Sequence, residues 1–381
     1  MEGFTGNRVF LSAPMSDEQD KRAVVAAMNS GWIAPAGPAL QDFEEEVAAH
    51  SGRRHAVALS SGTAALHLGL KYLGVQPGDF VLVPDVTFAA TAFAVSYLNA
   101  TPYFVDVDDS FGNLDPKLLY RSIDDIRSNG GRVAAAIPVD LYGTPVDYSA
   151  VVGQLQELDV PILEDAAESL GSRVGSATTG SFGEASIFSF NGNKILTTSG
   201  GGMLLTDDEV FAKKVRNWAT QSREEVVWYE HEEIGYNYRM SNLLAALGAS
   251  QMKRLDDIVE HRRSIREWYG SGLSGLPGVS VLQDPPWGQS NAWLTVARFD
   301  AETHPGAPER VRLVLEESNI ESRPVWKPMH QQPVYADAPR LLTGASSRWF
   351  TEGLCLPSGP SMTQDLVDRI CSTIAKELGH K

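Results

Sequence analysis

The chain of 381 residues has little of several features that define whole classes of protein. It has two cysteines, Cys355 and Cys371, which argues against a disulfide framework or a cysteine metal site and fits a reducing compartment. No apolar run reaches the roughly 18 residues that a membrane-spanning helix needs. The first residues lack the basic region and apolar core of a secretory signal. We therefore expect a cytoplasmic protein without a membrane partner.

Basic residues are also scarce. The 32 Lys and Arg residues stand against 48 Asp and Glu residues, which gives a formal net charge of -16. Such a charge argues against nucleic acid and anionic membranes as partners. The hydrophobic share of 43% is ordinary for a globular protein, and a chain of this length is more often two domains than one.

Apolar segments alternate with helical ones in the first half of the chain, after a first helix expected over residues 17–28 with Ser16 as its N-cap. The expected strands are 55–59, 80–84, 102–107, 133–139 and 161–164, and the helices between them include 63–73 and 87–98. Near-continuous apolar strands that alternate with helices predict an α/β fold with a parallel sheet covered on both faces. Ligands of such sheets bind beyond the carboxyl ends of the strands.

The pattern loosens after about residue 219. Residues 221–233 are polar and aromatic without an apolar period, which predicts an exposed loop. A helix is expected over 242–261. We predict a large domain over residues 1–248 and a smaller C-terminal domain over 249–381.

Lys194 follows a buried strand. The apolar run from Ile187 to Phe190 ends at Asn191-Gly192, a strong turn signal, and Lys194 comes directly after it. Desolvation lowers the pKa of a buried lysine and makes it a better nucleophile towards carbonyls. From this stretch alone, an ordinary surface lysine after a hairpin is the commoner outcome. The glycines at 200–202 would let the backbone pass close to a bulky group.

A second segment, Ser60 to Leu66, follows the first strand and opens a helix. Helix N-termini offer free N–H groups to a phosphate, and the glycine at 62 permits close approach. Serine and threonine are also simply good N-caps, so this segment alone does not decide. Phe88 follows the next strand, where its ring could lie over a planar ligand or pack in the core.

An acidic side chain, Asp165, ends the strand over 160–163. A carboxylate desolvated there needs a cationic partner, and the protonated pyridine nitrogen of pyridoxal phosphate is one. A metal ion is the competitor, but no neighbouring His or Cys supports it. Ser189 could add a hydrogen bond to the phosphate. A phosphate seat, a stacking aromatic, a pyridinium acid and a Schiff-base lysine therefore occur in one chain order.

The order and wording of these motifs resemble the DegT-type nucleotide-sugar aminotransferases, pyridoxal-phosphate enzymes of the aspartate-aminotransferase fold (fold type I). The resemblance runs almost from end to end. Its motifs are Trp32-Ile-Ala-Pro, Ser61-Gly-Thr-Ala-Ala-Leu66, Glu164-Asp-Ala-Ala-Glu168, Ser189-Phe-Asn-Gly-Asn-Lys194, Gly235-Tyr-Asn-Tyr-Arg-Met-Ser-Asn242 and Leu356-Pro-Ser-Gly359. The stretches 191–203 and 323–330 look most like the UDP-4-keto-sugar 4-aminotransferases of the bacillosamine pathway.

The resemblance implies a large domain with a mostly parallel sheet, a smaller α+β C-terminal domain, and pyridoxal 5'-phosphate as cofactor. It implies that Lys194 forms the Schiff base, Asp165 faces the pyridine nitrogen, and Glu168 lies near the ring hydroxyl. Phe88 would stack on the ring. The phosphate would be held by Gly62, Thr63 and Ser189.

The resemblance also implies a homodimer with shared active sites, because Asn237 would reach the cofactor phosphate of the neighbouring subunit. Trp326 and His330 could line the sugar pocket, with packing an equal alternative for both. One departure concerns Asp140, which stands where many relatives carry His before Leu-Tyr-Gly. It leaves open any role carried over for that position.

The implied reaction transfers an amino group from glutamate to the 4-keto carbon of a UDP-linked 2-acetamido-2,6-dideoxy-4-keto hexose. In related 3-dehydratases a histidine replaces the lysine, so Lys194 indicates transamination. A dTDP-keto-sugar 3- or 4-aminotransferase is the alternative among enzymes. A non-catalytic sensor that binds the cofactor is the alternative from another class, and the acidic chain leaves no room for its DNA-binding segment.

Overall fold

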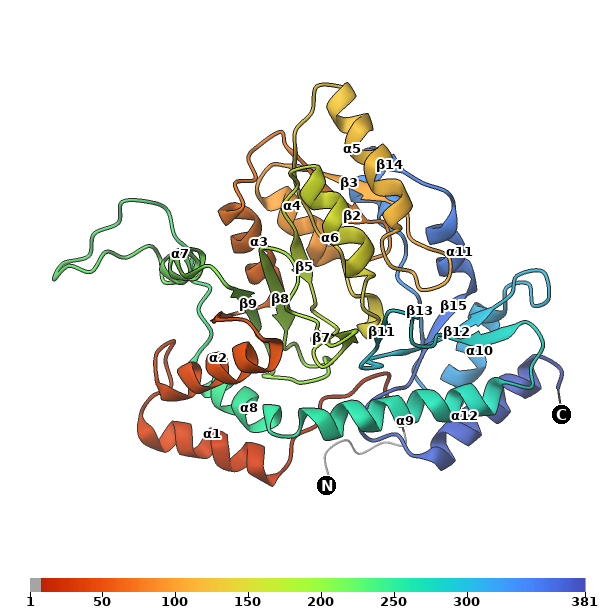
Figure 1. Cartoon of the computed structure of the whole chain (residues 1–381). Helices are drawn as coiled ribbons and strands as arrows, with labels where there is room; N and C mark the ends of the chain where they lie inside the picture. The colour runs from red at the N-terminus through yellow and green to blue at the C-terminus, as the bar shows by residue number, and fades with distance from the viewer. Residues whose placement is uncertain (1–7, 381) are drawn as a thin grey trace.

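A long sheet forms the centre of the molecule (Figure 1). The computed structural model describes residues 8–380. Two four-stranded sheets, in the orders β1-β9-β8-β5 and β14-β3-β2-β4, are joined by parallel bridges that connect β4 and the residues after it to β5. The strands are β1 (His55–Leu59), β2 (Phe80–Pro84), β3 (Thr101–Val105), β4 (Val133–Ala136), β5 (Leu163–Asp165), β8 (Ala185–Ser189), β9 (Gly202–Thr206) and β14 (Arg340–Leu341). Only β9 runs antiparallel to its neighbours in this sheet, which confirms the predicted α/β class.

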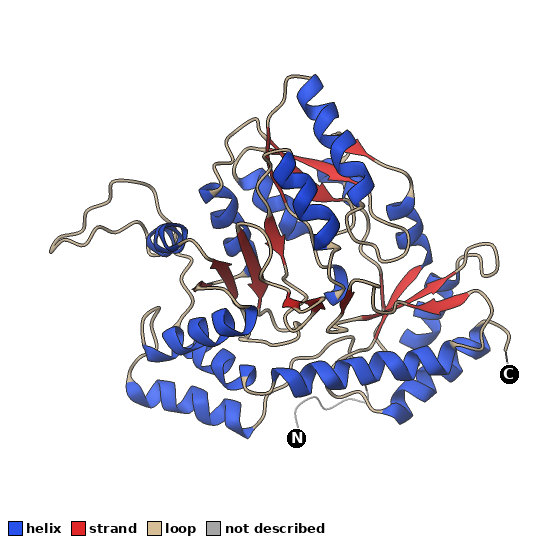
Figure 2. Cartoon of the chain, in the orientation of Figure 1, coloured by secondary structure: helices blue, strands red, loops and turns tan. Residues whose placement is uncertain are grey.

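Helices cover both faces of the sheet because the strands are apolar on both sides (Figure 2). Along β1, Val57 and Leu59 pack in the cluster that contains α3, α4 and α7. Ala56 and Ala58 point to the opposite face and join α2 and α8. Helices α5 and α6 complete that cover over β2, β3 and β4. The helices are α2 (Pro38–Ser51), α3 (Gly62–Tyr72), α4 (Ala89–Tyr97), α5 (Leu119–Ser128), α6 (Tyr148–Glu157), α7 (Glu209–Ala219) and α8 (Asn242–Met252).

A second, antiparallel sheet lies in the C-terminal part, in the order β10-β12-β15-β13. Its strands are β10 (Val279–Val281), β12 (Thr295–Phe299), β13 (Arg323–Pro324) and β15 (Gly353–Leu356). The apolar sides of α9, α10 and α12 share a core with β12 and β15. The helices of this part are α9 (Leu255–Leu273), α10 (Ala307–Glu317), α11 (Ala345–Glu352) and α12 (Gln364–Glu377).

The C-terminal part also contributes to the main sheet. Strand β14 pairs in parallel with β3, and the buried side chains of Met329 and Tyr335 pack with α3 and α4. Part of the chain after residue 249 therefore packs with the large domain. The predicted domain boundary between residues 248 and 249 stays a prediction. Short elements complete the fold: β6 (Arg173–Val174), β7 (Ala177–Thr178), β11 (Gly288–Gln289) and the 3-10 turns Pro116–Leu118, Leu141–Gly143, Met329–Gln331 and Pro333–Tyr335.

Two details of the predicted helices are wrong. The first helix, α1 (Glu18–Ser30), is capped by Asp17 and not by Ser16, because the Asp17 carboxylate accepts the N–H groups of its first turn. The helix predicted over 242–261 is two helices, α8 and α9, with a break at which Arg254 forms ion pairs with Asp17 and Asp20. Within residues 8–380 no helix is long and apolar enough to cross a membrane.

Candidate active site

A cavity of about 630 Å³ opens at the carboxyl ends of the central strands. It is lined by residues that come within a few positions after β1, β2 and β4, by the last residues of β5 and β8, and by parts of the C-terminal sheet. The cavity brings together eight of the ten predicted site residues, which are Gly62, Thr63, Phe88, Asp165, Glu168, Ser189, Lys194 and Trp326.

The N-terminus of α3 faces this cavity. Ser61 is its N-cap, and the Ser61 hydroxyl accepts the Ala64 N–H at 3.0 Å. The remaining N–H groups of a first helical turn have no partner within the helix, so Gly62 and Thr63 can offer theirs to an anion. A Cβ on Gly202 would lie 2.4 Å from the Gly62 nitrogen, so glycine is what lets β9 pass this close. The Cβ of Ser189 lies 3.1 Å from where a Gly62 side chain would begin.

Asp165 is the buried carboxylate at the end of β5. Its Oδ2 accepts the Thr91 hydroxyl at 2.7 Å, and its Oδ1 accepts the Ala167 N–H at 3.2 Å. Burial raises the pKa of Asp165, while the two hydrogen bonds and the charge of Lys194 act against that rise. A cation bound in the cavity beside Asp165 would stabilise its ionised form, because burial penalises the charge.

Lys194 and Glu168 form an ion pair in the cavity wall. Lys194 Nζ lies 3.1 Å from Glu168 Oε1, and the two side chains are 10% and 3% exposed. Burial raises the pKa of Glu168 to about 7, although Lys194 and the Tyr142 N–H, a donor at 2.8 Å, both lower it. A carboxyl group with this pKa can hold or release a proton near neutral pH.

The loop that carries Lys194 is fixed from two sides. The Asn193 carbonyl accepts the Ser12 hydroxyl at 2.8 Å and the Trp293 indole N–H at 2.6 Å. The Trp293 ring centroid lies 4.1 Å from Lys194 Nζ, within cation–π range. The amine is therefore held between a carboxylate and an aromatic face.

Aromatic side chains form another wall of the cavity. Phe88 is the N-cap residue of α4 and is 56% exposed, so its ring is not core packing. Its centroid lies 5.6 Å from that of Trp326, which in turn lies 4.9 Å from Tyr142. The Tyr142 hydroxyl accepts the Trp326 N–H at 3.0 Å, which fixes the backbone of Trp326 at the cavity.

Two predicted residues lie outside the cavity lining. His330 Nδ1 contacts Asp85 Oδ2 at 2.5 Å, and the His330 N–H donates to Asp85 Oδ1 at 2.9 Å. Asp85 is fully buried, so this pair anchors the segment after Trp326. Asn237 is exposed and bridges to Thr220 at the base of a projecting loop. The roles predicted for both residues stay predictions.

Asp140, at the position of the family departure, is a buried hydrogen-bond acceptor. Its carboxylate accepts the Val146 N–H at 2.9 Å and the hydroxyls of Tyr148 at 3.0 Å and Ser169 at 2.6 Å. Burial raises its pKa to about 7. Asp140 does not line the cavity, so its contacts support the turn at Tyr142 and not the ligand site itself.

Three further residues that line the cavity were not predicted from the sequence: Thr91, Tyr142 and Trp293. Thr91 follows Thr87 by one helical turn, and their hydroxyls lie 2.8 Å apart, so its spacing from Thr87 was a usable signal. Trp293 lies about 100 residues after Lys194, and no local pattern connects the two.

The fold is that of the fold type I pyridoxal-phosphate enzymes, and comparisons with known proteins agree. A model of the DegT/DnrJ/EryC1/StrS aminotransferase family matches residues 14–375. The Bacillus subtilis protein EpsN is 42% identical over 373 residues, with 96% of this chain and 95% of EpsN covered. GDP-perosamine synthase of Caulobacter vibrioides is 34% identical over 377 residues, with 97% and 98% covered.

Among solved structures, a DegT DnrJ EryC1 StrS aminotransferase from Brucella abortus matches with a TM-score of 0.88 at 28% identity, with 95% of each chain covered. The chain belongs to the DegT/DnrJ/EryC1/StrS aminotransferase family. It is a nucleotide-sugar aminotransferase, and its cofactor is pyridoxal phosphate.

The residues of the cavity fit this cofactor. The unpartnered N–H groups at the start of α3 suit the phosphate, and the close approach of Gly202 leaves no side chain in their way. The buried carboxylate of Asp165 suits a protonated ring nitrogen, and the partly exposed face of Phe88 suits a planar ring.

Proposed function

We propose that the enzyme transfers an amino group from glutamate to the 4-keto carbon of a UDP-linked 2-acetamido-2,6-dideoxy-4-keto hexose, giving a UDP-4-amino sugar for glycan biosynthesis. The pair of Lys194 and Glu168, 3.1 Å apart in a cavity that also contains Asp165, carries the transamination part of this proposal. The choice of a UDP sugar is supported by the resemblance of residues 191–203 and 323–330 to the UDP-4-keto-sugar 4-aminotransferases.

Bound pyridoxal phosphate supplies the carbonyl that accepts the amino group and an electron sink for the carbon that loses a proton. Asp165 would hold the ring nitrogen protonated, and Gly62, Thr63 and Ser189 would hold the phosphate. Phe88 would cover the ring. These contacts would keep the reacting carbon next to Lys194, and proximity of this kind is a large part of the rate.

Lys194 Nζ acts as the general base and acid. In the first half-reaction the neutral amine would remove the proton from the α-carbon of glutamate, the amino group would stay with the cofactor, and water would supply the keto oxygen of the 2-oxoglutarate that leaves. In the second half-reaction the ammonium group returns a proton to C4 of the sugar. Glu168 orients Nζ across 3.1 Å, and with a pKa of about 7 it can exchange a proton with the amine between the two halves.

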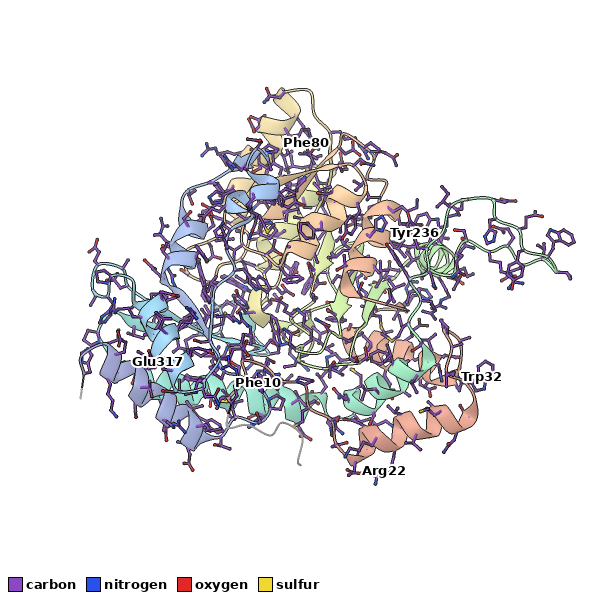
Figure 3. The ribbon with its side chains drawn as sticks, turned by 180° about the vertical axis from the view of Figure 1, so that it is seen from behind. Phe10, Arg22, Trp32, Phe80, Tyr236 and Glu317 are labelled. Carbon is purple, nitrogen blue, oxygen red and sulfur yellow. The ribbon has the colours of Figure 1, made fainter. Side chains whose placement is uncertain are left out.

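We also propose that the enzyme is a homodimer in which Asn237 reaches the cofactor phosphate of the second subunit. The loop between α7 and α8 projects from the body of the molecule (Figure 1). This loop exposes large apolar side chains, with Val227 96% and Tyr229 79% exposed. Figure 3 shows Tyr236, next to Asn237, at the root of this loop, on the same side of the molecule as the exposed Trp32. A second subunit would cover this apolar surface.

A GDP-linked keto sugar is a second candidate substrate. The relative named GDP-perosamine synthase is 34% identical over almost the whole chain, which is enough to keep a GDP sugar open. A dTDP-linked keto sugar is the remaining alternative. The choice depends on contacts to the base of the nucleotide.

The test converts the enzyme to its amino form with glutamate and then offers the three keto sugars separately. We expect the Schiff-base absorption band to return with the UDP-linked N-acetylated sugar at least about a hundredfold faster than with the GDP- and dTDP-linked sugars, because a site built to hydrogen-bond a base rejects another one strongly. Faster return with the GDP or dTDP sugar would keep the aminotransferase and overturn the UDP assignment.

A further inference from the structure

The charges in the cavity wall do not suit anionic substrates. Within the described residues, the lining has two cationic side chains, Lys194 and Arg323, and three carboxylates, Asp165, Glu168 and Glu321. Glutamate brings two carboxylates into this cavity, and a nucleotide sugar brings a diphosphate. Lys194 forms an ion pair with Glu168 and has the proposed role in proton transfer. Among the described lining residues of one subunit, Arg323 is the other cation that can bind an anionic substrate group.

Arg323 is positioned by strand pairing. It opens β13, opposite Cys355 of β15, which also lines the cavity. Its guanidinium donates from Nε at 3.0 Å and from Nη2 at 2.8 Å, both to Glu321 Oε1. Within residues 8–380, Nη1 has no acceptor, and the side chain is 66% exposed. The guanidinium is thus held at the cavity with part of its hydrogen-bonding fork unused.

Glu321 is the residue that occupies Arg323 in the protein alone. Its Oε2 accepts the Leu11 N–H at 3.1 Å, and its side chain is 18% exposed, so the carboxylate is anchored. An exposed ion pair between residues this close in sequence usually contributes little stability. This pair differs from an ordinary surface pair because Glu321, Arg323 and Leu11 all line the active-site cavity.

We propose that Arg323 is an anion subsite of the active site, where a substrate carboxylate or diphosphate replaces Glu321 on the guanidinium. Arginine binds both groups through its planar fork, and Glu321 keeps that fork aligned until an anion arrives. The inference rests on the proposed aminotransferase function and is independent of the identity of the sugar.

The test measures binding to the enzyme loaded with cofactor. Half-saturation by glutamate is followed by the spectral change, and binding of UDP, GDP and dTDP is measured by calorimetry. Arg323→Ala should lower the affinity for glutamate, or for the nucleotide that the wild type binds, at least about tenfold. The reason is that a hydrogen bond to a charged group is lost. Arg323→Lys should recover part of that loss, since it keeps the charge without the fork. Circular dichroism verifies that each variant is folded.

Arg312→Ala is the matched control. Arg312 is an arginine paired with a nearby glutamate in the same manner, through Nε and Nη2 to Glu309 at 2.7 Å, but it lies on α10 and outside the cavity lining. It should change each affinity by less than about twofold, as surface substitutions do.

Glu321→Gln separates a subsite from simple charge repulsion. It frees Arg323 and keeps an acceptor for the Leu11 N–H, so the anion that uses Arg323 should bind more tightly. If Glu321 acts through Arg323, this gain disappears in the Arg323→Ala background, whereas general repulsion by Glu321 would give the same gain in both backgrounds. Persistence of the gain would overturn the proposal.

The outcomes separate the possible sources of the anion. If Arg323→Ala binds only glutamate more weakly, the subsite belongs to the amino donor. If it binds only the nucleotide more weakly, the subsite belongs to the diphosphate. Weaker binding of both means that the two substrates use the subsite in turn. Unchanged binding of all probes in Arg323→Ala contradicts the subsite. A wild-type enzyme that does not respond to glutamate contradicts the proposed function itself.

Discussion

Glu164 and Asp165 are neighbours on β5, and their carboxylates serve opposite faces of the sheet. Asp165 points into the cavity, where it accepts the Thr91 hydroxyl. Glu164 points away and accepts the N–H groups of Gly180 at 2.6 Å and Phe182 at 2.8 Å. Successive side chains of a strand point to opposite faces of the sheet. Of two similarly buried acids, one therefore faces the cavity and the other accepts backbone N–H groups.

This alternation predicts opposite phenotypes for two conservative variants. Asp165→Asn removes the charge that faces the cofactor and should lower kcat roughly a hundredfold or more, with little change in Tm. Glu164→Gln turns an amide N–H towards a backbone donor and should cost about 1–3 kcal/mol of stability, with kcat within about twofold. Steady-state kinetics and thermal unfolding on both variants measure this. An equal loss of kcat in the two would contradict the assignment of Asp165.

A second prediction concerns the close approach of β9 to the phosphate seat. Gly202→Ala places a Cβ 2.4 Å from the Gly62 nitrogen and the Ser61 carbonyl carbon, so the start of α3 must shift. Overpacking of this kind costs about 1–3 kcal/mol, and we expect cofactor affinity to fall about tenfold in equilibrium titrations.

Gly192→Ala is its control, because a Cβ there meets nothing closer than the Ser199 carbonyl oxygen at 4.0 Å. Its cofactor affinity should stay within about twofold of wild type. Equal effects of the two substitutions would mean that the contact between β9 and α3 does not shape the phosphate seat.

A third prediction follows from the buried carboxyl group of Asp140. Burial raises its pKa from 3.8 to about 7, so the folded protein binds more protons than the unfolded chain in that interval. Stability from this group is therefore present below about pH 4 and is lost as the pH rises through about 7, by at most roughly 4 kcal/mol.

Asp140→Asn lacks this titration. The difference in unfolding free energy between variant and wild type, from urea unfolding at several pH values, should move in favour of the variant between about pH 4 and pH 7. A difference that stays constant with pH would show that Asp140 does not have the raised pKa.

A fourth prediction tests the shared dimer. Lys194→Ala should lose more than about a thousandfold in turnover, because the Schiff-base lysine and the proton carrier are lost together, and Asn237→Ala should be impaired as well. When the two variants are coexpressed with different tags, the mixed dimer regains one complete site, with Lys194 from one subunit and Asn237 from the other. Its activity should therefore exceed that of both parents. A mixed dimer no more active than Asn237→Ala homodimers would contradict shared sites.

The sequence was most informative where chemistry and local structure coincide. The apolar strands and the turn at Asn191-Gly192 were sufficient to predict the parallel sheet and the position of Lys194 beyond the carboxyl end of a strand. They were sufficient because a buried strand needs continuous apolar residues, and a ligand site of this fold lies where such strands end.

Long-range contacts were not predictable in the same way. The break between α8 and α9 has no proline or glycine at Lys253 and Arg254, and it is stabilised by ion pairs from Arg254 to α1. The contact of Trp293 with Lys194 and the pairing of β14 with β3 also join distant parts of the chain. Tertiary packing decides such features, and local propensity does not encode them.

The most direct measurement of the role of Lys194 is the near-ultraviolet and visible spectrum of the purified protein with pyridoxal phosphate. We expect a Schiff-base absorption band that disappears when glutamate is added and that is absent from Lys194→Ala, although that variant remains folded. A wild-type protein without the band, or a Lys194→Ala variant with the same band and the same response to glutamate, would contradict the assignment of Lys194 as the residue on which the enzyme depends.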